Sequence, residues 1–130
     1  MTTQRSWSGS PWESRAGYCR AIRVDDRVWV SGTGPFRDGE LVHPGDPALQ
    51  AERCFQIVLE ALAEVGASPE HVVAVHMYVT DIRAAAEFSE AHRRAFGEHP
   101  PTSTLLQVSA LVHPEMLIEV EAEAVVREAV

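Results

Sequence analysis

The sequence has few cysteines and no long apolar run. Its 130 residues include only two cysteines, Cys19 and Cys54, and these form no closely spaced pair. A disulfide framework is therefore not expected, and a reducing, cytoplasmic setting is predicted. The apolar stretches are short and interrupted, so no membrane span is predicted, and residues 1–7 lack the apolar segment of a signal peptide.

An excess of positive charge is also missing. The formal net charge is −8 at pH 7, and the densest basic stretch is His92-Arg93-Arg94 on a predicted helix. Proteins that bind nucleic acids usually carry a stripe of basic side chains that neutralises phosphates. We interpret the short basic stretch as a solvated helix face, and no nucleic-acid partner is expected.

The sequence contains none of several short motifs that indicate a bound cofactor. The six histidines include no H-x-H or H-E-x-x-H spacing, so no metal site is predicted. There is no phosphate-binding G-x-x-x-x-G-K and no G-x-S-x-G nucleophile turn. Gly32-Thr33-Gly34 follows a predicted strand without the third glycine of a dinucleotide site, which favours a tight turn. No cofactor is expected.

The first half of the chain predicts a hairpin, a turn and a helix. The β-rich runs 18–24 and 27–31 are separated by Asp25-Asp26, and Gly39 marks a second turn. Asp46 is a suitable N-cap, Pro47 suits the first helical position, and Gly66 can end the helix. Its inward face is predicted from residues at helical spacing: Phe55, Val58, Leu59, Leu62 and Val65.

The second half predicts a strand, a helix and two more strands. Residues 72–80 read as a strand whose buried face carries Val73, Val75, Met77 and Val79. A second helix is predicted between Asp81 and Gly97, with an inward stripe of Ala84, Phe88, Ala91, Ala95 and Phe96. Final strands are predicted near 102–111 and 116–126.

This order of elements predicts an α+β fold in one domain, with both helices on one face of the sheet. The other face would then be bare. Because an exposed apolar sheet face must be covered, self-association of the chain is expected.

The last predicted strand alternates apolar and acidic residues. In Ile118–Val125, the three glutamates at 119, 121 and 123 share one side. One interpretation is a solvated face. The other places Glu119 in a cleft as a proton-transfer group, where burial and neighbouring negative charges would raise its pKa. The spacing of the glutamates does not distinguish between these two interpretations.

Several short motifs resemble one known family. Residues 31–35, Ser-Gly-Thr-Gly-Pro, resemble the S-G-x-x-P turn of RidA-like (YjgF-type) reactive-intermediate deaminases. Residues 118–122, Ile-Glu-Val-Glu-Ala, resemble the family's I-E-I-E-A signature, and Thr80-Asp81-Ile82 followed by Phe88 and Phe96 resembles its D-x-x-x-F stretch. The resemblance covers about residues 18–126 in a single domain of residues 1–130, after an N-terminal segment of residues 1–16.

The resemblance implies a chorismate-mutase-like α+β fold with a mixed sheet, assembled as a homotrimer with clefts between subunits. Members of the family hydrolyse reactive imines and enamines, and they need no cofactor. Glu119 matches a last-strand glutamate that handles the attacking water. Tyr18 falls at a tyrosine of the cleft, and Gly32, Ser103, Thr104 and Leu105 are expected to shape the pocket.

Two positions depart from the family pattern. Ser103 stands where the family carries an arginine that binds the substrate carboxylate, and Leu105 replaces a cysteine. A neutral hydroxyl is a weaker carboxylate ligand than a bidentate guanidinium, so the usual 2-iminopropanoate activity is in question. Arg20, at the same strand parity as Tyr18, either supplies the missing cation or is an ordinary surface arginine.

Three functions follow. The leading one is an imine or enamine deaminase that acts on a small metabolite. The second is a non-catalytic, metabolite-binding trimer of the same fold. The third is a ribonuclease, an activity attributed to some family members, which the acidic charge disfavours.

Overall fold

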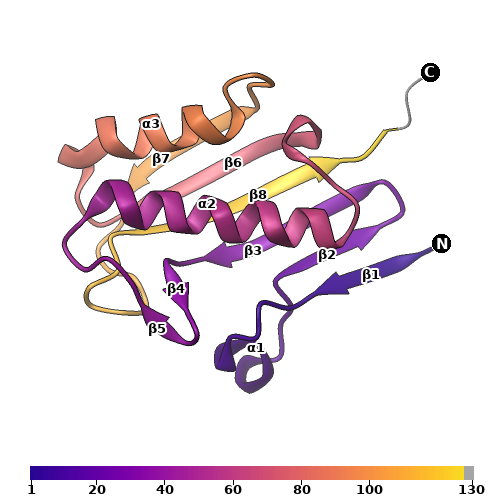
Figure 1. The fold of residues 1–130 in the computed structure, drawn as a ribbon, viewed down its shortest axis with the longest axis horizontal. Coiled ribbons are helices and arrows are strands. Elements are labelled where there is room, and N and C mark those ends of the chain that lie inside the picture. The colour runs from indigo at the N-terminus through magenta and orange to yellow at the C-terminus, as the bar shows by residue number, and fades with distance from the viewer. Residues whose placement is uncertain (128–130) are drawn as a thin grey trace.

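The computed structural model describes residues 1–127, which form a sheet covered on one face by two helices (Figure 1). The strands are β1 (Thr3–Ser6), β2 (Ala21–Val24), β3 (Arg27–Thr33), β4 (Phe36–Arg37), β5 (Glu40–Leu41), β6 (Val72–Val79), β7 (Thr102–Gln107) and β8 (Ile118–Val125). The helices are α1 (Pro11–Ala16), α2 (Pro47–Glu64) and α3 (Ala85–Phe96), with 3-10 turns at Pro69–His71 and Ile82–Ala84. Within residues 1–127, no helix has the length and apolar character needed to cross a membrane.

The main sheet is mixed, as predicted. Its strand order is β1-β2-β3-β8-β6-β7, and β4 pairs with β5 in a separate hairpin. The β6–β7 pair is parallel, while the other neighbouring pairs are antiparallel. Both longer helices, α2 and α3, lie on the same side of this sheet (Figure 1). The predicted α+β architecture is confirmed.

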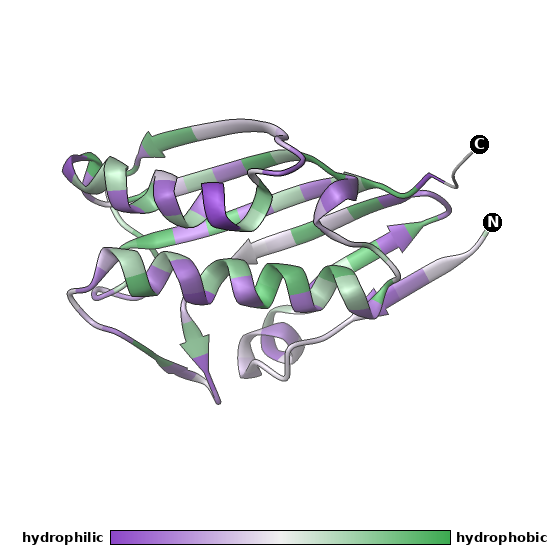
Figure 2. Cartoon of the chain, turned by 45° about the horizontal axis from the view of Figure 1, so that its top comes forward, coloured by the Kyte–Doolittle hydropathy of each residue, from purple (hydrophilic) through white to green (hydrophobic). Residues whose placement is uncertain are grey.

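Helix α2 begins and ends where its capping residues predict. The Asp46 side chain accepts a hydrogen bond from the backbone N–H of Leu49 at 3.0 Å, and Pro47 occupies the first turn. Just after the helix, Gly66 has a φ of +81°, a conformation that glycine adopts without strain. The inward face of α2 packs on the sheet through Phe55, Val58 and Leu62, which are fully or almost fully buried. Figure 2 shows the hydrophobic and hydrophilic residues alternating along the strands beneath.

The buried face of β6 differs from the prediction at its first residues. Val75, Met77 and Val79 are buried, but Val73 is 44% exposed and Val72 is buried in its place. An irregularity in the β6–β8 pairing between Val72 and Ala74 causes the difference, because an extra residue there reverses the side-chain alternation. The assignment of Val73 to the core was wrong.

Several predicted boundaries were too generous. The second strand begins at Ala21 rather than at residue 18, and β7 ends at Gln107 instead of residue 111. Asp81 caps the 3-10 turn Ile82–Ala84, so α3 starts only at Ala85. The N-terminal segment, for which no elements were predicted, forms strand β1 against β2 and the short helix α1.

Gln50 ties the start of α2 to the segment before β8. Its side chain is completely buried, donates to the carbonyls of His43 (3.2 Å) and Glu115 (3.0 Å), and accepts from the N–H of Leu117 (2.8 Å). We expect Gln50→Leu to lower the free energy of unfolding by about 1–3 kcal/mol, because buried backbone groups lose their partners. Urea titration would measure this loss. The exposed Gln56→Leu should change stability far less, and equal effects would contradict the account.

Candidate functional site

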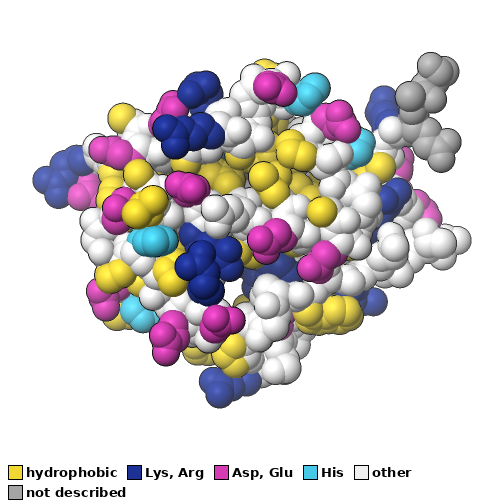
Figure 3. Space-filling model, in the orientation of Figure 1, with side chains coloured by type: hydrophobic (Ala, Val, Ile, Leu, Met, Phe, Trp, Pro, Cys, Tyr) yellow, Lys and Arg dark blue, Asp and Glu magenta, His cyan; other side chains and the backbone are white. Residues whose placement is uncertain are grey.

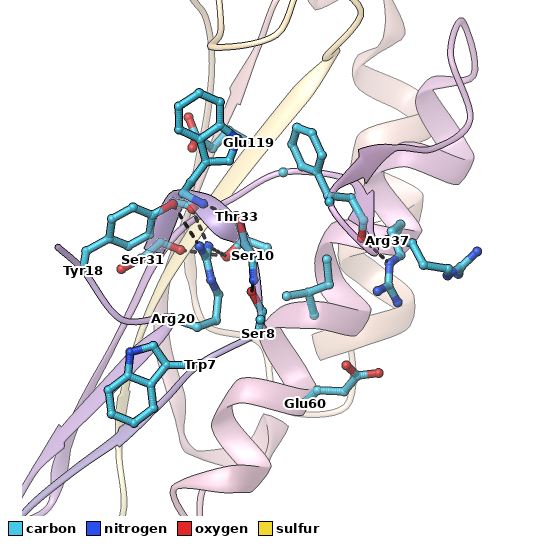
Figure 4. Close-up of a pocket in the computed structure, with 18 of the residues that line it drawn as sticks. Trp7, Ser8, Ser10, Tyr18, Arg20, Ser31, Thr33, Arg37, Glu60 and Glu119 are labelled. Atoms are coloured by element: carbon cyan, nitrogen blue, oxygen red, sulfur yellow. Dashed lines mark hydrogen bonds between the residues drawn. The ribbon is translucent and has the colours of Figure 1, made fainter. Parts of the chain in front are cut away.

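A cleft of about 690 Å³ lies among the N-terminal segment, the end of β3, the β4–β5 hairpin and one side of α2. Four residues proposed from the sequence line it together: Tyr18, Arg20, Gly32 and Glu119 (Figure 4). They come from the loop before β2, from β3 and from β8. Residues far apart in the sequence therefore meet at a single cavity, which is the geometry of a small-molecule site.

Arg20 organises one wall of this cleft. Only 6% of the residue is exposed, so the interpretation as a surface arginine is wrong. Its Nε donates to Glu13 Oε2 at 3.2 Å in a buried ion pair. Its Nη1 donates to the Gly32 carbonyl (2.6 Å) and to Thr33 Oγ1 (2.9 Å). A long contact of 3.4 Å joins Nη2 to the Tyr18 hydroxyl, and the guanidinium lies 5.4 Å from the centre of the Tyr18 ring.

These bonds occupy most of the Arg20 guanidinium. A guanidinium has five N–H donors, and the contacts above engage four of them. Glu13 also balances the charge at close range. Arg20 therefore holds Tyr18 and Gly32 in place and keeps one donor on Nη2 for other partners.

Glu119 reaches the cleft beside Gly32. A β carbon at position 32 would lie 2.7 Å from Glu119 Oε1, closer than such atoms ever approach. Gly32 lies between Val30 and Thr33, where β3 carries one more residue than its partner β8, so the strand bulges there. A side chain at position 32 would therefore displace the Glu119 carboxylate from its place in the cleft.

Burial raises the pKa of Glu119 above its ordinary value. The positive charge of Arg20 opposes this rise, and the negative charge of Glu121 adds to it. A carboxyl group with a raised pKa can exchange protons closer to neutral pH than an exposed one.

The other glutamates of β8 have different surroundings. Glu121 accepts a short hydrogen bond from the Tyr78 hydroxyl, which raises the pKa of Tyr78 to about 12. His76 Nδ1 lies 3.8 Å from the same carboxylate. Glu123 is exposed and pairs across the sheet with Trp29. The three glutamates share a face, as predicted, but Glu119 is the one that lines the large cleft.

Ser103, Thr104 and Leu105 do not reach this cleft within the chain. They lie on β7, which forms an edge of the sheet, and β6 separates β7 from β8. Their side chains also alternate. Thr104 is in register with His76 and Glu121 on the open face, whereas Ser103 and Leu105 point to the helix side. The predicted site is therefore divided between two regions of the chain.

Several lining residues were not found from the sequence. They are Trp7, Trp12, Phe36, Arg37, Arg53 and Met116. Glu13, the partner of Arg20, was also missed, although Ser10-Pro11 followed by Glu13 is a typical helix start and could have revealed α1. The ion pair itself leaves no signal, because residues 13 and 20 belong to different elements.

Within residues 1–127, no group of three or more His, Cys, Asp or Glu side chains is arranged to bind a metal ion. Of the two cysteines, Cys19 is half-buried and Cys54 is buried. Cys54 is completely buried, and burial raises the pKa of its thiol, so it is not a nucleophile.

The chain is thus a small α+β protein with a cleft that forms a candidate ligand site, and comparisons identify its family. Residues 9–126 match the family model described as Endoribonuclease L-PSP. A crystal structure of a member of the highly conserved YjgF/YER057c/UK114 family from Mycobacterium tuberculosis has a TM-score of 0.87 and 37% identity, covering 96% of this chain and 100% of that one. The 3-aminoacrylate deaminase RutC of Acinetobacter baylyi is 30% identical over 84% of this chain and 86% of its own length.

A structure of Escherichia coli TdcF with bound serine is also similar, with a TM-score of 0.77 and 25% identity over 93% of this chain and 92% of that one. The chain belongs to the YjgF/RidA family. The resemblance drawn from residues 31–35 and 118–122 is confirmed, and the match begins before residue 18.

Glu13→Ala tests the role of the buried ion pair. It leaves the Arg20 guanidinium buried without its counter-charge, so we expect the free energy of unfolding to fall by about 3–5 kcal/mol. Chemical denaturation would measure it. Glu90→Ala is the matched control, since Glu90 pairs with arginines in solvent and should matter much less. Similar losses in both variants would refute a special role for Glu13.

Proposed function

We propose that this protein hydrolyses a small imine or enamine in a cleft shared between subunits of a homotrimer. The observation that carries the proposal is Glu119, a half-buried carboxyl with a raised pKa at the wall of a cleft that also holds Tyr18. The relative named 3-aminoacrylate deaminase and the one solved with serine support a small amino-acid-like ligand.

The chemistry needs a water molecule and a group that moves protons. In the proposed reaction, Glu119 takes a proton from water as the water oxygen adds to the carbon of the protonated C=N group, giving a carbinolamine. That proton then passes to the nitrogen, Glu119 accepts the hydroxyl proton as the C–N bond breaks, and a carbonyl compound and ammonia leave. An enamine would first take a proton on carbon to become the imine. One carboxyl group can serve these steps in turn.

A covalent route, in which a lysine side chain forms an imine with the substrate, is not open to this protein. The sequence contains no lysine, since all eleven basic residues other than histidine are arginines. The usual nucleophile for a Schiff base is therefore missing. Direct attack by water is the simpler path, because an imine carbon is already electrophilic.

Arg20, Tyr18 and Gly32 have supporting roles in this proposal. Arg20 fixes the Gly32 carbonyl and the Tyr18 ring, and its remaining Nη2 donor is available to the ligand. Gly32 leaves room for the Glu119 carboxylate. These contacts thus hold the Glu119 carboxyl group in the position where it must bind the attacking water.

The remaining wall of the site would come from a second copy. Ser103, Thr104 and Leu105 lie on an edge strand away from the chain's own cleft, and the sheet face opposite the helices carries exposed Trp29 and Leu106. A trimer that covers this face would place β7 of one subunit against the Glu119 cleft of its neighbour. Thr104, whose side chain lies on the covered face, would then contact the ligand, and Ser103 would reach it around the free edge of β7.

The ribonuclease named in the family model has less support in this chain. A net charge of −8 repels the phosphate backbone, and the cleft contains Asp38, Glu60 and Glu64 as well as arginines. In a non-catalytic binding protein of this fold, Glu119 would not transfer protons. The Glu119→Gln experiment below therefore also distinguishes an enzyme from a binding protein.

The pH dependence tests Glu119. If its carboxylate is the base, kcat/KM falls as the pH drops through the raised pKa, with a midpoint above the ordinary 4.5. Glu119→Gln should lower kcat/KM by about 10²- to 10⁴-fold and abolish this acid limb. Imine hydrolysis would be followed with 2-iminopropanoate generated in situ. The control Glu123→Gln changes an exposed carboxyl on the same strand and should keep the limb. Hydrolysis that is indifferent to Glu119→Gln would favour a binding protein.

Ser103→Arg tests the neutral β7 wall. Restoring a guanidinium at this position should raise kcat/KM for 2-iminopropanoate by about tenfold or more, because a charge-assisted bond to the carboxylate is added. Steady-state kinetics on the two proteins would measure the gain. Unchanged or lower kcat/KM would show that β7 does not face the substrate carboxylate.

A further inference from the structure

The cleft continues well beyond Glu119. Its volume of about 690 Å³ falls in the range of sites for ligands much larger than a three-carbon imine. Besides Glu119, the lining includes Ile57 and Met116, which are almost fully buried, and Phe36 from β4. These side chains give the cleft an apolar part that suits a carbon chain.

Two further arginines, Arg37 and Arg53, also line the cleft. Arg53 projects from α2, is half-buried, and donates from Nε to the Phe36 carbonyl at 2.9 Å. A long contact of 3.4 Å joins its Nη1 to Gln56. Arg37 comes from the β4–β5 hairpin and lines the same cleft (Figure 4). In the space-filling view, dark-blue arginine side chains border a hollow beside α2 (Figure 3).

Neither arginine is used in an ion pair within residues 1–127. Arg20, Arg83, Arg93 and Arg94 each have a carboxylate within 4.0 Å, whereas Arg37 and Arg53 have none in the described part of the chain. Arg53 nevertheless has a fixed position, because its Nε is bonded to a backbone carbonyl while its Nη2 makes no hydrogen bond in that part of the chain. A held guanidinium with open donors is suited to bind an oxyanion.

Acidic side chains also line the cleft and must be considered. Glu60 and Glu64 follow Arg53 on α2 by two and three turns, about 10 Å or more along the helix axis. Asp38 adjoins Arg37 in the hairpin turn without pairing with it. The end of the cleft nearest Arg53 and Arg37 is therefore its basic end.

Glu119, Arg53 and Arg37 all line the same cleft, so one ligand can contact both its acidic and its basic side chains. Strand β7, which would bind a carboxylate adjacent to the reactive carbon, carries the neutral Ser103 instead of an arginine.

We propose that Arg53 and Arg37 form a subsite for a carboxylate that lies several atoms away from the reactive C=N carbon. The inference rests on the proposed function and specifies its substrate class: an imine or enamine with a distal carboxylate on an aliphatic chain. The chain would occupy the apolar part of the cleft, with its reactive carbon at Glu119.

Binding of stable carbonyl products tests the subsite without requiring catalysis. Calorimetry on the intact protein would compare 5-oxohexanoate, which has a distal carboxylate, with 2-hexanone, its uncharged analogue, and with pyruvate, whose carboxylate is adjacent to the carbonyl. We expect the Kd of 5-oxohexanoate to be lower than the other two by about tenfold or more. Arg53→Gln and Arg37→Gln should each remove most of this difference.

Arg94→Gln is the matched control, because Arg94 pairs with Glu90 outside the cleft and its loss should leave the selectivity intact. Arg37 is exposed and makes no side-chain hydrogen bond within residues 1–127, so Arg37→Gln remains informative even if Arg53→Gln fails to fold. Equal affinities for the three ligands, or selectivity that survives both cleft variants, would overturn the subsite. Selective binding without any imine hydrolysis would instead reject the proposed function and leave the subsite standing.

Discussion

The buried ion pair between Arg20 and Glu13 fixes the shape of the cleft. A guanidinium that is almost completely removed from water must have its donors satisfied, and here they engage a carboxylate, the Gly32 carbonyl and the Thr33 hydroxyl. Glu13 in turn accepts a hydrogen bond from the backbone N–H of Ser8 at 3.0 Å. One charged pair thus fastens the N-terminal segment to the bulge of β3, against which Glu119 lies.

The charges around this pair divide the cleft into parts with different chemistry. Glu119 is only half-buried near Arg20, and burial outweighs the attraction of that cation, so the carboxyl keeps a raised pKa. Arg20 is neutralised at close range by Glu13, while Arg53 and Arg37 have no carboxylate partner within residues 1–127. The proposed proton-transfer group, the apolar lining and these two arginines share one cleft, an arrangement that would orient a ligand with one charged end.

Local signals in the sequence were enough for much of the fold and part of the site. Asp46, Pro47 and Gly66 marked the ends of α2 because capping depends on neighbouring residues alone. The Val73 error came from a bulge in β6, which depends on pairing with a distant strand. The parity argument for Tyr18 and Arg20 assumed a strand that starts only at Ala21, yet both residues line the cleft. Glu13 and Arg53 could not be assigned, since tertiary packing alone brings them to the site.

Mixed assemblies provide the most direct test of a cleft that is shared between subunits. Glu119→Gln would disable the wall formed by β8, and Ser103→Trp would obstruct the wall formed by β7. After unfolding and refolding together in equal amounts, random trimers should contain about a quarter of clefts with both walls intact. The account predicts that imine hydrolysis returns in the mixture, although each variant alone is inactive. If the mixture stays as inactive as its components, Glu119 and Ser103 act within one chain or not at all, and the shared cleft is contradicted.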